Sequence, residues 1–153
     1  MKKILLSILL LGIFVFSFTG CTNKNDSRLG EVSDIEINEN YVSTSIKEGT
    51  LTNRGAVFIL NNISDKLLQY GEEYHLEIKD NNTWYILKPI EELSFITPLY
   101  YLEANKSVEL DIDWSYGYGN LEPGEYRFIK SFSYPSGDDD IESFNIGIEF
   151  TIN

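Results

Sequence analysis

The lone cysteine of this 153-residue chain, Cys21, is the side chain whose chemistry the sequence defines best. A single thiol cannot form an intramolecular disulfide, and it cannot supply the paired cysteines of a redox motif or of a cysteine-zinc site. Two lysines and an almost wholly apolar stretch over residues 4–18 precede it, and Thr19 and Gly20 are small. A positive start, an apolar segment and a small-residue exit are the three parts of a secretory signal.

The four residues 18–21, Phe-Thr-Gly-Cys, resemble the lipobox of bacterial lipoproteins, with Phe18 where that family prefers Leu. The resemblance implies that residues 1–20 are a signal peptide, that cleavage occurs before Cys21, and that its thiol is acylated. It therefore implies a protein held by lipid in the cell membrane and facing the extracytoplasmic side. The alternative is an uncleaved membrane helix, but an apolar run of about 15 residues is short of the ~20 needed to span a bilayer.

The other side chains with catalytic potential do not form a recognisable constellation. His75 is the only histidine, so a multi-histidine metal site is excluded, and no Gly-x-Ser-x-Gly motif accompanies it. We expect it to be an exposed residue of a strand. Asp111 and Asp113 share the outer face of another predicted strand, but two-carboxylate hydrolysis needs such a pair in a cleft. We expect no catalytic residue and no cofactor.

Asp138, Asp139 and Asp140 follow Pro135-Ser136-Gly137 in a predicted turn. Three carboxylates could ligate Ca²⁺, but the alternating spacing and terminal Glu of an EF-hand loop are missing. A solvated turn is the alternative, and the sequence assigns no metal ligand.

Net charge excludes one class of partner. Removing the two signal lysines from the 12 basic residues leaves 10 against 24 acidic ones, a formal charge of −14. Nucleic-acid binding rests on neutralising phosphates with cations, so it is not expected. Anionic lipid also repels such a surface, so the domain should not lie flat on a membrane.

Residues 41–153 alternate between short β-prone segments and turn residues, which predicts an all-β sandwich or barrel. Residues 21–40 are polar and acidic and predict a flexible tether, with a possible edge strand at 34–37. Residues 89–101 predict a partly extended crossover. About seven strands are expected, at 41–46, 56–60, 73–79, 83–87, 107–114, 125–133 and 141–152.

The segment Leu121-Glu122-Pro123-Gly124-Glu125-Tyr126 predicts a tight turn followed by a tyrosine corner, in which the Tyr126 hydroxyl bonds back to the turn. Together with Tyr118-Gly119, Arg127, Lys130 and the earlier Tyr70-Gly71-Glu72-Glu73-Tyr74 run, it resembles a family of bacterial immunoglobulin-like domains. That resemblance implies an immunoglobulin-like β-sandwich without a disulfide. It implies no activity, because such folds host many functions.

Tyr116-Gly117-Tyr118 is the candidate binding loop, because two rings flanked by glycine next to Trp114 could reach solvent. The alternative is that both rings pack over the corner. The sequence thus favours a non-catalytic, lipid-anchored binding or scaffolding module with an unknown protein or envelope ligand. A cell-envelope enzyme, or an inhibitor or sensor accessory lipoprotein, is the alternative.

Overall fold

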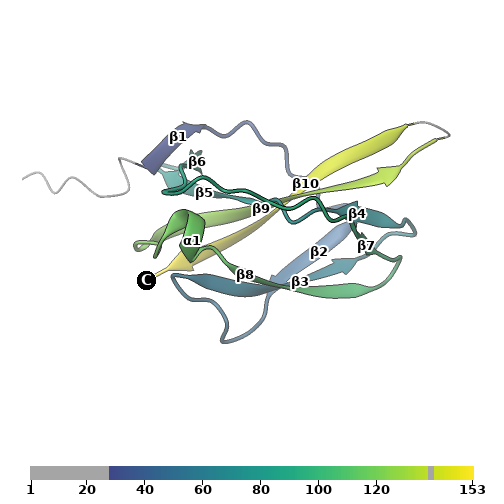
Figure 1. The fold of residues 1–153 in the computed structure, drawn as a ribbon, viewed down its shortest axis with the longest axis horizontal. Coiled ribbons are helices and arrows are strands. Elements are labelled where there is room, and N and C mark those ends of the chain that lie inside the picture. The colour runs from purple at the N-terminus through teal and green to yellow at the C-terminus, as the bar shows by residue number, and fades with distance from the viewer. Residues whose placement is uncertain (1–27, 138–139) are drawn as a thin grey trace, which may run out of the picture.

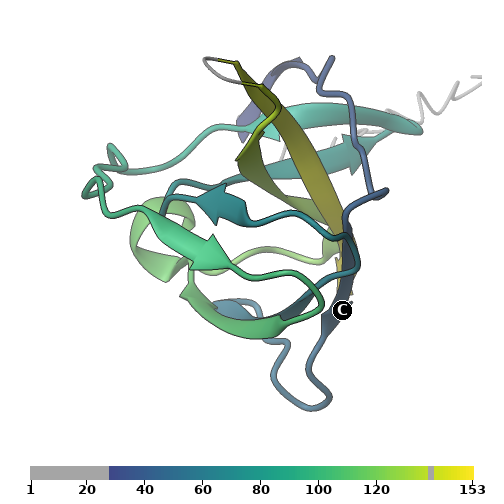
Figure 2. The same cartoon turned by 90° about the vertical axis from the view of Figure 1, so that its right-hand side faces the viewer.

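The structure, a computed structural model, describes residues 28–137 and 140–153, and within them two antiparallel β-sheets pack face to face (Figures 1 and 2). The prediction of an all-β sandwich without a disulfide is confirmed. The described residues form ten strands and one short helix: β1 (Leu29–Val32), β2 (Val42–Ile46), β3 (Gly55–Asn62), β4 (Leu68–Tyr70), β5 (His75–Asp80), β6 (Thr83–Leu87), β7 (Tyr100–Leu102), β8 (Ser107–Asp113), α1 (Ser115–Tyr118), β9 (Gly124–Pro135) and β10 (Ile141–Ile152).

The smaller sheet has the order β2-β3-β8, so the apolar strand expected at 56–60 lies in β3, at the centre of this sheet. The larger sheet has the order β1-β6-β5-β9-β4-β7, with β10 paired to β9. The twelve-residue β9 holds this sheet together: β10 runs along its whole length, and β5 and β4 pair with successive parts of it.

Period-two alternation explains which side chains form the core. Along β9, Tyr126, Phe128 and Phe132 point inward. Phe128 stacks on Phe58 of β3, while Tyr126 and Phe132 stack on Phe150 and Phe144 of β10. Trp114 is fully buried at one end of this core, and its indole Nε1 donates to the carbonyl of Asn53 at 3.0 Å. Stacked and tilted rings thus fill the space between the sheets.

The predicted tether at 21–40 is wrong from residue 28 onward. β1 pairs with β6, and residues 33–38, which we call the N-terminal strap, cross the larger sheet to β10. The strap is held by Ser33 N donating to Trp84 O at 2.9 Å and Asn38 N donating to Asn145 O at 2.8 Å. The edge strand expected at 34–37 is reduced to a single parallel bridge, between Ile37 and Asn145 of β10.

The strap covers the charged residue Glu77, which alternation along β5 places on the outer face of the larger sheet. Glu77 is 0% exposed; Arg127 Nε donates to its carboxylate at 2.6 Å, and the Ser33 hydroxyl also donates to it. The Arg127 guanidinium lies 4.7 Å from the centre of the Trp84 ring. Glu77 is therefore a buried ion-pair residue, because strap, arginine and tryptophan together remove it from water.

No helix in the described part of the chain is long and apolar enough to cross a bilayer.

Candidate functional site

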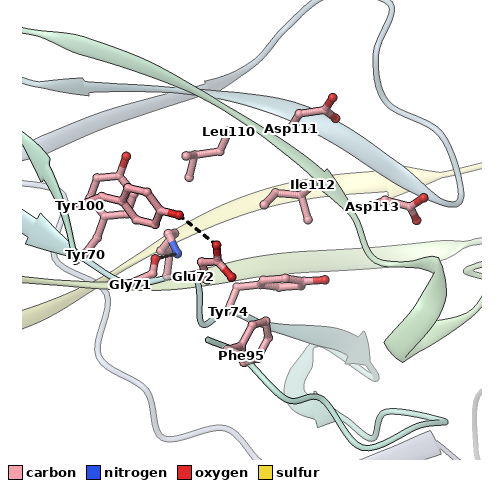
Figure 3. A pocket seen from close by; sticks show the side chains of 11 residues that line it. Tyr70, Gly71, Glu72, Tyr74, Phe95, Tyr100, Leu110, Asp111, Ile112 and Asp113 are labelled. Atoms are coloured by element: carbon pink, nitrogen blue, oxygen red, sulfur yellow. Dashed lines mark hydrogen bonds between the residues drawn. The ribbon is translucent and has the colours of Figure 1, made fainter. Parts of the chain in front are cut away.

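The two sheets do not close against each other along one side of the sandwich. β8 is an edge strand of the smaller sheet, and β4 and β7 end the larger one. Leu110 and Ile112 of β8 point inward but are only half buried. The opening is a pocket of about 340 Å³, which we call the inter-sheet groove (Figure 3). Its lining residues are Tyr70, Gly71, Glu72, Tyr74, Phe95, Tyr100, Leu110, Asp111, Ile112, Asp113 and Lys130.

Two pairs of rings form the walls of the groove. Tyr70 and Tyr100 are stacked with their centres 5.4 Å apart, and Tyr74 meets Phe95 edge to face at 5.5 Å. Tyr74 also stacks on the core residue Phe128 at 5.2 Å. The walls are thus continuous with the rigid core, while Tyr100 is 40% exposed and can be reached from outside.

Lys130 brings a buried ammonium group to this groove. It is 3% exposed, and its Nζ donates to Gly71 O at 2.7 Å and to Glu73 O at 3.0 Å. Burial lowers the pKa of Lys130 to about 8, although the charges of Glu72 and Glu73 oppose this shift. The two carbonyls hold the amine in place, so it is a fixed hydrogen-bond donor and not a free nucleophile.

One carboxylate points into the groove. Tyr100 Oη donates to Glu72 Oε1 at 2.9 Å, and the same hydrogen bond raises the pKa of Tyr100 (Figure 3). Asp111 and Asp113 belong to the outer face of β8, and their carboxylates turn away from the rings. The groove therefore presents one acid, one base, phenol groups and flat apolar surfaces to whatever enters it.

The segment that carries the family resemblance forms a compact corner. Tyr126 Oη donates to Glu122 O at 2.8 Å across the Pro123-Gly124 turn, and Leu121 is buried beside it. The profile of the bacterial Ig-like domain family matches residues 38–151. The chain belongs to this family. No curated protein and no solved structure matches the chain.

In this Ig-like domain, the two tyrosines of the candidate binding loop lie in different environments. Tyr116 is 72% exposed, but Tyr118 is 2% exposed and its hydroxyl accepts a hydrogen bond from Leu76 N at 3.2 Å. The hypothesis that both rings reach solvent is therefore wrong for Tyr118, and the alternative that both rings pack over the corner is wrong for Tyr116. The cause is the helical turn α1, which directs the side chains of Tyr116 and Tyr118 to different sides. Between them, Gly117 packs against Leu93.

His75 is not the exposed residue that we expected. It is half buried, its Nε2 has no hydrogen-bond partner within the described residues, and burial lowers its pKa. His75 pairs with Ile129, and Lys130 is the next residue along β9, so the histidine lies on the opposite face of the sheet from the groove. Histidine and lysine thus cannot act on one substrate.

The remaining candidates lie partly outside the described residues. Cys21 and the predicted signal peptide belong to residues 1–27, which are not described. Asp138 and Asp139 are also outside, and the carbonyl of Asp140 accepts a hydrogen bond from Ser136 N at 2.9 Å. Among the residues that are described, no group of three or more His, Cys, Asp or Glu could hold a metal ion.

The groove was missed because its members look ordinary in the sequence. One signal was available: Lys130 occupies an inward position of β9, between Phe128 and Phe132. A lysine in phase with core phenylalanines indicates either a structural partner or an opening in the core. Here it marks both.

Proposed function

We propose that this Ig-like domain is a lipid-anchored, non-catalytic binding module on the extracytoplasmic side of the cell membrane, and that it binds its ligand in the inter-sheet groove. The groove is the observation that carries the proposal. It is an aromatic-walled pocket with a few fixed polar groups, the usual form of a ligand site, and its volume of about 340 Å³ suits one ring-sized group.

The polarity of the groove limits the chemistry of that group. Glu72 supplies an acceptor and Lys130 a positively charged donor, so a bare cation or a bare anion would meet one group of like charge. A ligand with a flat apolar face, and with hydroxyl or amide groups that both donate and accept, satisfies both side chains and stacks on Tyr100.

The non-catalytic part of the proposal is supported by how the titratable groups are held. In the groove, Lys130 donates to two backbone carbonyls and Glu72 accepts a hydrogen bond from the Tyr100 hydroxyl, while His75 lies on the other face of the sheet. General acid–base chemistry needs groups that can reach a proton of the substrate, and both groups of the groove are already engaged within the protein. The anchoring part is supported by Cys21 and the residues that precede it.

Two exposed tyrosines allow a matched test of the site. A photoreactive phenylalanine derivative is placed at Tyr100, inside the groove, or at Tyr116, on α1, in the full chain expressed in its own membrane. We expect crosslinks to a discrete, non-lipid envelope component from position 100 and no such crosslinks from position 116. If only position 116 gave such crosslinks, the ligand would bind at the loop around Tyr116 and not in the groove. In the same cells, Cys21→Ala should release the protein from the membrane fraction, and full retention would refute the anchor.

A further inference from the structure

The first described residue, Arg28, is fixed to one end of the sandwich. Its Nη1 donates to Tyr118 O at 2.7 Å and its Nη2 to Lys88 O at 3.0 Å, and Lys88 N donates back to Arg28 O at 2.9 Å. The chain therefore leaves the folded part beside α1. Figure 1 shows this end, with α1 and the start of β1, opposite the tip of the β9–β10 hairpin.

The segment available between the anchor and Arg28 is short. Arg28 is the seventh residue after Cys21. A fully extended chain covers at most about 3.6 Å per residue, so this segment spans at most about 25 Å. β9 alone, with twelve residues, extends about 40 Å along the sandwich. The tether is thus shorter than the domain that it holds.

The surface around Arg28 differs from the rest of this acidic domain. Tyr116 and Ile90 are both more than half exposed, and Ile90 N donates to Gly117 O at 2.7 Å, so the two lie on adjoining backbone. Lys88 is exposed at the same place, and the side chain of Arg54 reaches Ser115 Oγ at 3.3 Å. Glu91 and Glu92 are also exposed nearby, so this surface is mixed in charge and does not favour strong binding to anionic lipid by itself.

A phenol ring, an isoleucine and cations with long stems are suited to the boundary between lipid headgroups and water. We propose that this end of the domain, with Arg28, Lys88, Ile90 and Tyr116, faces and touches the bilayer, while the β9–β10 tip points away from it. The inference rests on the lipid anchor of the proposed function. It gives Tyr116 a lipid-facing role and leaves the groove open to the side for ligand.

Fluorescence quenching in vesicles tests the orientation. The acylated protein, with an environment-sensitive dye on Tyr116→Cys or on Ser136→Cys, is placed in vesicles of phosphatidylcholine and phosphatidylglycerol (4:1) that contain a headgroup-nitroxide lipid. Both positions are exposed, and acylation removes the thiol of Cys21, so each protein carries one dye. We expect at least threefold stronger quenching at position 116 than at position 136.

A second pair of proteins controls for the tether. Twelve Gly/Ser residues inserted between Ser27 and Arg28 should reduce the difference between the two positions, because the longer tether no longer holds one end at the surface. Equal quenching at both positions in the acylated native-length protein would overturn the inference and leave the groove and the anchor intact. A mass spectrum without acyl chains on Cys21 would overturn the anchor and the inference together.

Discussion

Lys130 makes a specific prediction about how stability depends on pH. Its pKa is lowered in the folded domain to about 8, from 10.5 in a solvated chain, because its ammonium is buried. Between these two values the unfolded chain binds more protons than the folded one. The free energy of unfolding therefore rises as pH increases through this window.

The size of the effect follows from the shift. Between pH 7 and 9.5, a lysine with these two pKa values adds about 2 kcal/mol to the free energy of unfolding, since each pKa unit corresponds to about 1.4 kcal/mol. The scan should stop at pH 9.5. Burial raises the pKa of Tyr74 to about 12, so above pH 10 its unfolded form loses a proton first and stability falls.

The assay is urea denaturation of residues 28–153 at several pH values. Between pH 7 and 9.5, the free energy of unfolding of the wild type should rise by about 2 kcal/mol more than that of Lys130→Met, whatever the stability of the variant at pH 7. Lys47→Met is the matched control, because Lys47 is paired with Glu109 at the surface and is about half exposed. Its profile should follow the wild type. Parallel profiles for wild type and Lys130→Met would refute the view that Lys130 folds as a buried, charged amine.

Two further predictions concern buried hydrogen-bond partners. Tyr126→Phe removes the 2.8 Å bond to Glu122 O and should lower the free energy of unfolding by about 1–2 kcal/mol in chemical denaturation; a change of only a few tenths would mean that the corner does not stabilise the turn. Arg127→Met leaves the buried carboxylate of Glu77 without its cation and should cost about 3–5 kcal/mol, against less than about 1 kcal/mol for Lys47→Met at the surface. Equal losses for the two variants would show that the strap does not exclude water.

Alternation in the sequence was sufficient to predict the long strands. β8 and β10 are recognisable as strands because apolar residues recur at every second position, from Val108 to Ile112 in β8 and from Phe144 to Ile152 in β10. The three-residue strands β4 and β7 are too short for periodicity to reveal, and they border the groove. Beyond the inward position of Lys130, the groove was therefore not predictable, because it exists only where two unrelated sheet edges fail to meet.

Other differences have tertiary causes. Alternation assigns Glu77 to the polar face of β5, and its side chain does point to the other face of the sheet from the core residues Leu76 and Ile78. What the sequence could not indicate is that this outer face is covered. The cover is a polar segment whose Ser33 and Ile37 find partners far along the chain. A segment of low hydrophobicity was predicted to be a tether, yet a few backbone pairings are enough to dock it.

The pairing of β1 with β6 sets the shortest fragment that can be studied. β6, with the sequence Thr-Trp-Tyr-Ile-Leu, is rich in residues that favour β-structure. Within the described residues, β1 is the only strand that pairs with the edge of β6 that faces away from β5. A recombinant fragment that begins at residue 38, where the family match begins, or at 41 would leave the backbone amides and carbonyls of this strand unpaired. Such an edge is a template for association with a second molecule. Fragments intended for crystallisation or solution work should therefore begin at or before Arg28, and aggregation of shorter ones would reflect the cut and not the native protein.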